Sequence, residues 1–215
     1  MPEWGEIFAD PDMQDLAPNP EVTALLPEFH NRGLERVLDA GCGAGRHLGP
    51  LVREGFRVVG VDREASVWPA VRSKTGNCPR PPHLVQADLA HLPFRPGCFD
   101  LIVSINVINH GDTRAFQAYC REFRRVLRAG GHLFIIVSPR EFGELVRRPD
   151  TVELEPGTLV HIATPDGTLV HHFPTPEELA EQFPAYRRLR LETVRTAIPF
   201  MGGAKLPQLI FWAVK

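Results

Sequence analysis

The sequence predicts an α/β fold in which helices cover both faces of a mostly parallel sheet, a doubly wound arrangement. Strand-like and helix-like segments alternate from about residue 34 to residue 137, which is the pattern of a parallel sheet with crossover helices. The first strand runs straight into a glycine-rich turn and a helix, as βα units do. The chain has 215 residues, 43% of them hydrophobic, which is enough to bury the core of one sizeable domain.

The first half of the chain is predicted to contain three strands separated by helices. Its elements are an N-terminal lid or short helix at 1–19, helix 20–30, strand 34–40, helix 45–54, strand 56–61, helix 64–74 and strand 83–86. The first two strands are apolar, as strands buried on both faces are. Pro20 suits the first turn of its helix, whereas Pro69 predicts a break or a late start in the helix that contains it.

The second half is predicted to complete the sheet and to carry an insertion. Its elements are strand 99–105, helix 113–128, strand 132–137, insertion 140–175, a helix from 176, and strands 186–197 and 206–214. Gly130 and Gly131 are expected to end the first of these helices. The last two strands are expected to form an antiparallel hairpin at the edge of the sheet.

A turn signal and a helix start lie within or next to the insertion. Residues 158–164 and 168–173 flank Pro165-Asp166-Gly167, which predicts a β-hairpin. Thr175 is predicted to cap the following helix, because Glu178 stands three residues later and completes a capping box.

Charge and cysteine usage limit the classes of function. The formal net charge is −2, so strong attraction to nucleic acid or to an anionic membrane is not expected. The four cysteines, at 42, 78, 98 and 120, form no C-x-x-C pair, which is typical of a reducing cytoplasm. No signal-peptide core or bilayer-spanning run is evident. We therefore expect a cytoplasmic protein; the sequence carries no signal for its oligomeric state.

The turn after the first strand indicates a nucleotide-like ligand. Gly41, Gly43 and Gly45 let the backbone turn tightly and approach a ligand, and free N–H groups of the next helix point toward it. The dinucleotide fingerprint is G-x-G-x-x-G/A, and its last position would fall on Arg46, which is neither glycine nor alanine. Asp39 precedes the glycines; its carboxylate would repel a pyrophosphate and suits a ligand that carries an amine.

Asp39 and this glycine spacing resemble motif I of the class I S-adenosylmethionine (SAM)-dependent methyltransferases. Two later stretches resemble the same family: the run from Asp88-Leu89 through Leu92-Pro93-Phe94 to Phe99-Asp100, and the turn Leu127-Arg128-Ala129-Gly130-Gly131, in which alanine replaces the usual proline. The resemblance covers about residues 34–137. It implies a Rossmann-like sheet of seven strands, mostly parallel with an antiparallel last strand, and SAM as the cofactor.

The resemblance also implies that the cofactor lies across the ends of successive strands. Motif I would hold its methionine end, the end of the second strand its ribose, and the residues after the third strand its adenine. The expected cofactor-binding residues are Asp39, Gly41, Cys42, Gly43, Gly45, Asp62, Arg63, Asp88, Leu89 and Ser104. Asp62 also suits a ribose diol by its position alone, although proteins that bind NAD share this feature.

The methyl acceptor is expected to enter between the N-terminal segment, the loop after strand 99–105 and the insertion. The residues expected to contact it are Trp4, Phe8, Asn106, His110 and His171. His110 is the candidate general base, because an imidazole takes up a proton near neutral pH. The alternative is that His110 only caps or packs.

Three histidines of the insertion, His161, His171 and His172, lie in a stretch that resembles small methyltransferases of the tellurite-resistance type. Carboxylate or cysteine partners at recognisable spacing are missing, and alternate residues of a strand face opposite sides. A metal site is therefore not expected. These histidines are predicted to contact the acceptor or to cap the cleft.

The sequence thus predicts one domain over 1–215, with a lid at 1–33, a SAM-binding core at 34–137 and the insertion 140–175 beside the acceptor. The predicted activity is methyl transfer from SAM to a small-molecule acceptor, without nucleic-acid or membrane partners. Two alternatives stay open. One is a protein that binds SAM or S-adenosylhomocysteine without transferring a methyl group. The other is an NAD-dependent oxidoreductase, against which Asp39 and Arg46 argue.

Overall fold

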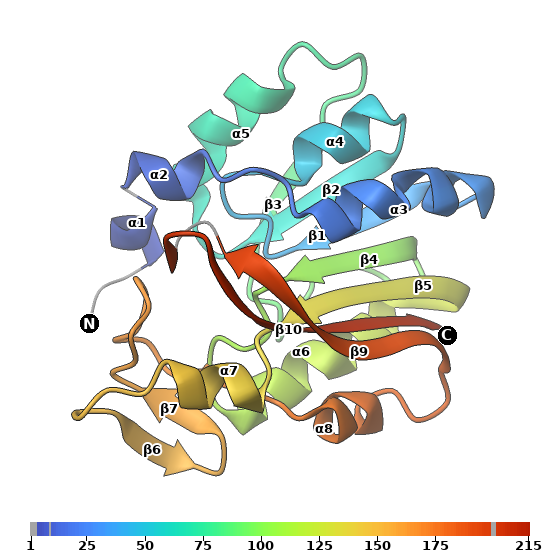
Figure 1. The fold of residues 1–215 in the computed structure, drawn as a ribbon. Helices are drawn as coiled ribbons and strands as arrows, with labels where there is room; N and C mark the ends of the chain where they lie inside the picture. Colours follow the sequence, from blue (N-terminus) through green and yellow to red (C-terminus); the bar gives the residue numbers. More distant parts are fainter. Residues whose placement is uncertain (1–3, 9, 199–200) are drawn as a thin grey trace.

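A seven-stranded sheet runs through the computed structural model, which describes residues 4–8, 10–198 and 201–215 (Figure 1). In spatial order its strands are β3 (His83–Gln86), β2 (Arg57–Asp62), β1 (Arg36–Ala40), β4 (Phe99–Ile105), β5 (Leu127–Val137), β10 (Ala204–Val214) and β9 (Arg187–Ile198). The first five are parallel to one another, and β10 is antiparallel to both of its neighbours. The predicted sheet, mostly parallel with an antiparallel last strand, is confirmed.

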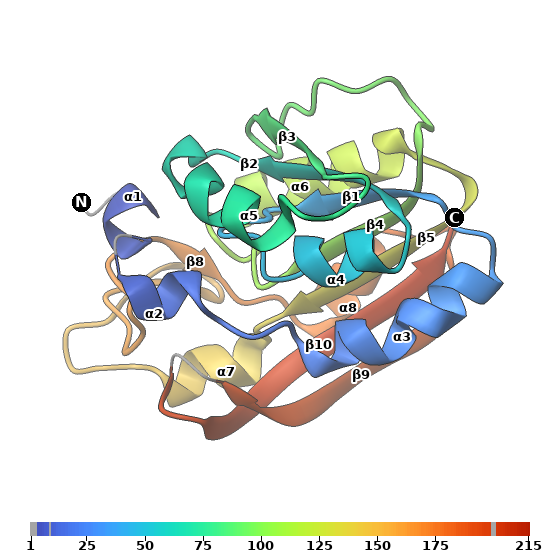
Figure 2. The same cartoon turned by 90° about the horizontal axis from the view of Figure 1, so that it is seen from above.

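Helices cover both faces of the sheet. They are α1 (Trp4–Ile7), α2 (Pro11–Gln14), α3 (Pro20–Asn31), α4 (Leu48–Arg53), α5 (Trp68–Thr75), α6 (Thr113–Val126), α7 (Arg140–Leu145) and α8 (Pro176–Glu181), with a short 3-10 turn at Ala65–Val67. The helices α3, α4 and α5 pack on one face, which Figure 2 views from above. The helices α6 and α8 pack on the other face. None of the helices in the described ranges is long and apolar enough to cross a membrane.

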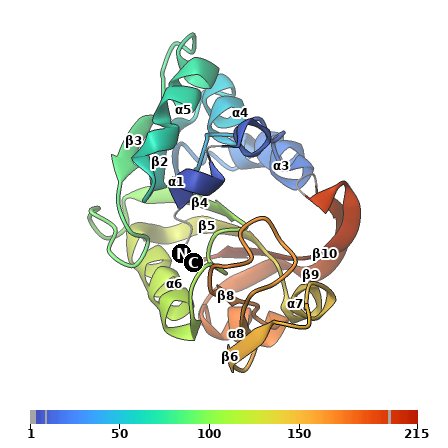
Figure 3. The same ribbon diagram turned by 90° about the vertical axis from the view of Figure 1, so that its left-hand side faces the viewer.

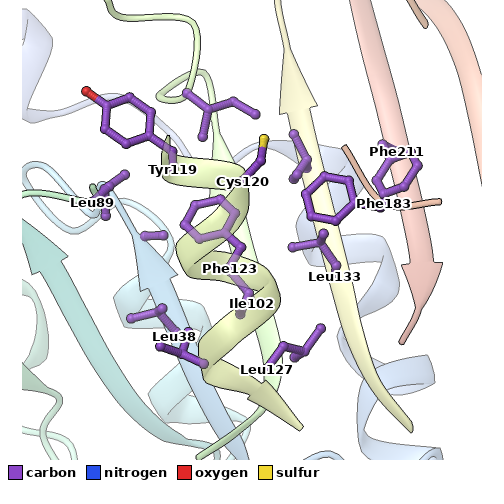
Figure 4. Packing of buried hydrophobic residues seen from close by; sticks show 14 of the residues in the cluster. Leu38, Leu89, Ile102, Tyr119, Cys120, Phe123, Leu127, Leu133, Phe183 and Phe211 are labelled. Atoms are coloured by element: carbon purple, nitrogen blue, oxygen red, sulfur yellow. The ribbon is translucent and has the colours of Figure 1, made fainter. Parts of the chain in front are cut away.

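The core follows from the alternation of side chains along each strand. Leu38, Ile102 and Leu133 face α6, where they surround Phe123 (Figure 4). Their neighbours in the chain, such as Leu101, point to the opposite cluster under α3 and α4. All residues of β4 are buried, as the continuous apolar run FDLIVSI predicts for a central strand.

The predicted end of the helix after β4 is wrong in one respect. The helix α6 ends at Val126, and Leu127 already pairs with Phe99 in the sheet. The Gly130-Gly131 turn therefore lies inside β5, where Gly130 N–H donates to the carbonyl of Lys215. The two glycines shape an irregular strand start next to the end of the chain, and they do not terminate the helix.

The insertion forms a second, three-stranded sheet of β6 (Val152–Glu155), β7 (Thr158–Val160) and β8 (His171–His172). The predicted hairpin is confirmed in the antiparallel pairing of β7 with β8. Its strands are shorter than expected, because residues 161–170 form a loop, and β6 was not predicted. An isolated bridge joins His171 to His110, and His172 N–H donates to the carbonyl of Asn109. The insertion is thus tied to the loop that follows β4.

A buried carboxylate joins the amino-terminal ends of β1 and β4. Asp100 accepts hydrogen bonds from the backbone N–H of Arg36 (2.8 Å), from the Arg36 guanidinium (2.9 Å) and from Arg128 (2.6 Å). Burial opposes its ionisation, but the hydrogen bonds from Arg36 and Arg128 outweigh it and hold the pKa of Asp100 below its ordinary value. This stabilisation is present above the unfolded-state pKa and is lost as the pH falls through the folded-state pKa.

We expect Asp100→Ala to lower the free energy of unfolding by about 1.5–3 kcal/mol at neutral pH, the range for hydrogen bonds to a charged group. Urea denaturation measures this, and the difference from the natural protein should shrink in acid, where Asp100 is protonated. Asp150→Ala is the matched control, because the Asp150–Arg148 pair is exposed on both sides and such pairs contribute little. Equal losses for the two variants would contradict the role given to Asp100.

Candidate active site

A cavity that opens to solvent lies at the carboxyl ends of the parallel strands. Figure 3 views the molecule from this side, where α1 and the insertion lie. The cavity is lined by the glycine turn, by the ends of β2 and β4, by α1 and α2, and by the loop 161–170 of the insertion. In open α/β sheets this edge is where ligands bind.

The glycine turn forms one wall of the cavity. Gly41 has φ +79°, and a Cβ atom there would lie 2.3 Å from a methyl group of Val107. Gly43 has φ +47° and lies against the ring of Phe8. Both glycines line the cavity. Gly45 does not line it; its φ of +81° and its contact with Val71 instead let the chain pass close under α5.

Two groups of opposite charge, Asp39 and Arg46, lie next to this turn. Asp39 is buried, and its Oδ2 atom has no hydrogen-bond partner among the described residues. Burial raises the pKa of Asp39 to about 7, against the opposing effect of the Arg46 charge. Arg46 lines the cavity, and burial lowers its pKa. Cys42 also lines the cavity, and burial raises the pKa of its thiol well above the ordinary value.

The acidic residue that ends β2 is tied to the glycine turn. Asp62 accepts a hydrogen bond from Gly43 N–H (2.8 Å) at Oδ2 and one from Glu64 N–H (3.0 Å) at Oδ1. Burial raises the pKa of Asp62, partly offset by these hydrogen bonds. At the mouth of the cavity, Arg63 and Asp88 form an exposed ion pair with an N–O distance of 3.4 Å. Leu89 follows as a buried part of the lining.

The expected position Ser104 lies one residue away from the cavity lining. Its hydroxyl is fully buried in the sheet and donates to the carbonyl of Ala40 (3.2 Å). Ile105 and Asn106 supply the lining instead. Asn106 has a φ of +56°, which is rare for a residue other than glycine. Its Oδ1 atom is buried without a partner within the described ranges, so this strained residue presents an unsatisfied acceptor.

Aromatic rings and a cluster of titratable groups form the far end of the cavity. The Trp4 ring lies 4.5 Å from the His110 ring and 5.9 Å from that of Phe8. His110 Nε2 lies 3.2 Å from Asp166 Oδ2, and His171 Nε2 lies 3.1 Å from the same oxygen. We call His110, Asp166 and His171 the His–Asp cluster.

The His–Asp cluster corrects one prediction. The expectation that the histidines of the insertion lack a carboxylate partner is wrong for His171, because the loop 161–170 brings Asp166 back to it. Burial opposes ionisation of Asp166, but its side-chain contacts with His110 and His171 outweigh this effect and hold its pKa well below the ordinary value. His172 lies outside the cluster, with its Nδ1 atom 2.9 Å from the Thr158 hydroxyl. His161 is exposed.

The lining residues that were not predicted from the sequence include Arg46, Tyr119 and Asp166. Arg46 was used only as an argument against a dinucleotide-binding turn. Its position directly after the glycine turn could have indicated that it lies at the ligand site. Tyr119 lines the cavity from α6, and its hydroxyl donates to the carbonyl of His110 (3.3 Å). Asp166 was read as part of a turn. No local pattern could have paired it with His110, which lies far away in the sequence.

Residues 38–135 match the family model of the methyltransferase domain. This range contains the glycine turn, Asp62, Asp88 and the whole of β4. The chain contains a methyltransferase domain. The prediction from the sequence motifs is confirmed at this level.

The curated relatives match about half of this chain. A protein of Methanocaldococcus jannaschii is 29% identical over 117 residues, which is 54% of this chain and 47% of that protein. A tRNA methyltransferase of Xenopus tropicalis is 35% identical over 56% of this chain and 18% of its own length. A malonyl-[acyl-carrier protein] O-methyltransferase of Legionella pneumophila is 35% identical over 51% and 39%. The chain thus spans less than half the length of these relatives.

Solved structures share the fold over nearly the whole chain. A SAM-dependent methyltransferase of Methanosarcina mazei superposes with a TM-score of 0.72 at 17% identity and covers 93% of this chain and 99% of that one. A Burkholderia thailandensis 1,6-didemethyltoxoflavin-N1-methyltransferase, solved with its substrate and S-adenosylhomocysteine, has a TM-score of 0.65 at 22% identity and covers 91% and 77%. The relatives therefore include enzymes named for tRNA and for small molecules. The net-charge argument against a nucleic-acid acceptor does not exclude one.

Proposed function

We propose that this methyltransferase transfers a methyl group from SAM to a small-molecule acceptor that binds beside the His–Asp cluster. One observation carries the proposal. A single cavity joins the glycine turn and Arg46, beneath which Asp39 is buried, to the His–Asp cluster. The first part is complementary to the methyl donor, and the second suits an acceptor that must lose a proton.

The residues present fit SAM. Its methionine end carries an ammonium and a carboxylate, and the Asp39 and Arg46 side chains offer the complementary charges. The unsatisfied oxygens of Asp39 and Asn106 are acceptors that an ammonium would satisfy. Gly41 and Gly43 leave backbone space that a Cβ atom would fill, and Cys42 contributes backbone between them.

The nucleoside end of the donor would lie toward β2 and β3. Asp62 would accept hydrogen bonds from the ribose hydroxyls, with Arg63 at the rim. Asp88 would accept from the adenine amino group, and Leu89 would pack against the ring. Ser104 would not contact the donor itself. Its hydroxyl holds β4 to β1 and so positions Ile105 and Asn106 at the cavity.

The chemistry would depend mainly on alignment. The sulfonium of SAM supplies a methyl group that is already activated, and the chain contributes proximity and orientation of the acceptor. Trp4 and Phe8, in the lid 1–33, would cover the acceptor from one side, and the insertion 140–175 would cover it from the other. The first three residues of that lid and residue 9 lie outside the described ranges.

His110 would take the proton of the acceptor. Burial lowers the pKa of His110, against the opposing effect of its hydrogen bond with Asp166, so the ring is neutral at physiological pH and ready to act as a base. If Nε2–H of His110 donates to Asp166, the Nδ1 atom of His110 carries the lone pair that accepts the proton. Asp166 would orient the ring, as a carboxylate does for a catalytic imidazole.

SAM affinity should depend on pH through Asp39. The pKa of Asp39 is raised to about 7, so at pH 6 the carboxyl group is mainly protonated and cannot pair with an ammonium. We expect the affinity to rise about eightfold between about pH 6 and pH 7.5, as the ionised fraction of Asp39 grows. Isothermal titration calorimetry at several pH values measures this. In Asp39→Asn the affinity should be weaker and nearly independent of pH; an unchanged pH profile would contradict the assignment.

Transfer of a radiolabelled methyl group from SAM tests the activity itself. The protein is incubated with a small-metabolite extract and, separately, with total tRNA. We expect label in the small-molecule fraction. Label in tRNA alone would overturn the proposed acceptor class. SAM binding without transfer to either fraction would favour a protein that only binds SAM or S-adenosylhomocysteine.

A further inference from the structure

The His–Asp cluster gathers two nitrogen atoms around a single carboxylate oxygen. His110 Nε2 and His171 Nε2 lie 3.2 Å and 3.1 Å from Asp166 Oδ2. The three atoms all lie within 4.8 Å of one another. They come from the loop after β4 and from the insertion, and the bridge between His110 and His171 joins these two segments.

The hydrogen bonds of His171 constrain where its protons lie. Its Nδ1 atom is 3.0 Å from the carbonyl oxygen of Leu169, which can only accept, so Nδ1 carries a proton. A neutral imidazole then has a lone pair on Nε2. That lone pair points to the Asp166 carboxylate, which is also an acceptor when ionised. The contact is favourable only if a second proton or a cation lies there.

We propose that His110, Asp166 and His171 form a binding site for a divalent transition-metal ion of the zinc type. Two imidazoles and a carboxylate are a common ligand set for zinc, with bond lengths of about 2.0–2.2 Å. Tetrahedral ligands at such distances lie about 3.3 Å apart. The separations of 3.2 Å and 3.1 Å between the histidine nitrogens and Asp166 are close to this value, and the two nitrogens lie within 4.8 Å of each other.

The surroundings of the cluster match those of metal-bound histidines. Such a histidine usually donates its second N–H to a carbonyl or carboxylate, which holds the ring in the tautomer that binds metal. The Leu169 carbonyl is placed to do this for His171. The His171 side chain is 3% exposed, whereas the side chains of His110 and Asp166 are 19% and 18% exposed. An ion could therefore reach a largely enclosed site from the cavity.

Three protein ligands leave one tetrahedral position open, as in catalytic zinc sites. All three residues line the cavity, so the open position is available to an acceptor with a thiol or hydroxyl group. Such an acceptor would bind as the anion, and its proton would pass to solvent. In the metal-loaded protein this replaces proton transfer to His110. This acceptor step rests on the proposed function, whereas the metal site itself does not.

Calorimetric titration of the chelator-treated full chain with Zn²⁺ tests the site. We expect one ion per chain with micromolar or tighter affinity. His171→Ala and Asp166→Asn should each weaken binding by at least about 100-fold, because a direct ligand contributes more than the groups behind it. The control His161→Ala removes an exposed histidine of the same loop and should bind Zn²⁺ as the natural protein does.

A parallel titration with SAM keeps this test separate from the proposed function. Retained SAM affinity in Asp166→Asn would show that the variant is folded. Loss of SAM binding in every protein, with Zn²⁺ binding intact, would overturn the proposed function alone. The proposal of a metal site is overturned if the natural protein does not bind Zn²⁺, or if His171→Ala binds it equally well. In that case a proton shared with Asp166 holds the cluster together.

Discussion

Replacing Asp62 by alanine should weaken SAM binding roughly 10- to 150-fold, which corresponds to the loss of about 1.5–3 kcal/mol from hydrogen bonds to a charged group. Asp62 is the carboxylate at the end of β2, and it is already aligned by the N–H groups of Gly43 and Glu64. A ribose would find a preorganised acceptor there, so little ordering has to occur on binding. Isothermal titration calorimetry with SAM measures the change.

The same substitution leaves two backbone N–H groups without their acceptor. The free energy of unfolding should fall by about 1–3 kcal/mol for each N–H group that stays buried and unpaired, which a domain with a typical stability of about 5–15 kcal/mol tolerates. Circular dichroism should therefore show a folded protein. Asp88→Ala is the matched control: its carboxylate is at the next strand end but is 43% exposed, and its effect on SAM affinity should be only a few-fold. Unchanged SAM affinity in Asp62→Ala would refute the ribose assignment.

Replacing Gly41 by alanine should destabilise the fold and close the donor end of the cavity. The new Cβ atom would lie 2.3 Å from a methyl group of Val107, so this side chain or the turn must move. Overpacking of this kind costs about 1–3 kcal/mol. The left-handed φ of +79° adds about 1–2 kcal/mol for a residue with a Cβ atom. We expect a loss of about 2–5 kcal/mol in urea denaturation and no measurable SAM binding.

Two further variants separate the backbone cost from the clash. Gly33→Ala places a methyl group at a similar φ of +66° with no atom within 4 Å, so it should lose only the backbone contribution and keep its SAM affinity. In the double variant Gly41→Ala with Val107→Ala, the clash is relieved and part of the stability should return. If Gly33→Ala and Gly41→Ala lose equal stability, the close approach of Val107 to the turn is not what requires glycine.

The donor end of the site could be predicted from the sequence, because each of its residues belongs to a short local motif. The glycine turn, Asp62 and Asp88 each follow a buried strand directly, so the apolar run in front of them gives their position at the sheet edge. Parallel strands bring these ends together whatever lies between them. The antiparallel last strand followed from resemblance to a family, and the strand order was not predicted. The residues of Ala204–Val214 carry no signal for which strand they pair with.

The acceptor end was predictable only in part, for a physical reason. His110 and His171 were expected near the acceptor, but Asp166 was read as a turn residue because Pro165 and Gly167 flank it. The contact of Asp166 with His110 depends on the course of the loop 161–170. Backbone hydrogen bonds between the insertion and the loop after β4 determine this course. Arg46 was missed because its burial beside Asp39 is a tertiary property. Both cases concern charged groups that pair across elements, which local periodicity does not encode.

Binding of the methyl donor is the central claim, and calorimetry with three ligands tests it most directly. The full chain is titrated with SAM, with S-adenosylhomocysteine and with NAD under the same conditions. We predict that SAM and S-adenosylhomocysteine bind at one site per chain and that NAD does not bind measurably. Binding of NAD without binding of SAM would contradict the assignment of the cavity to a methyl donor.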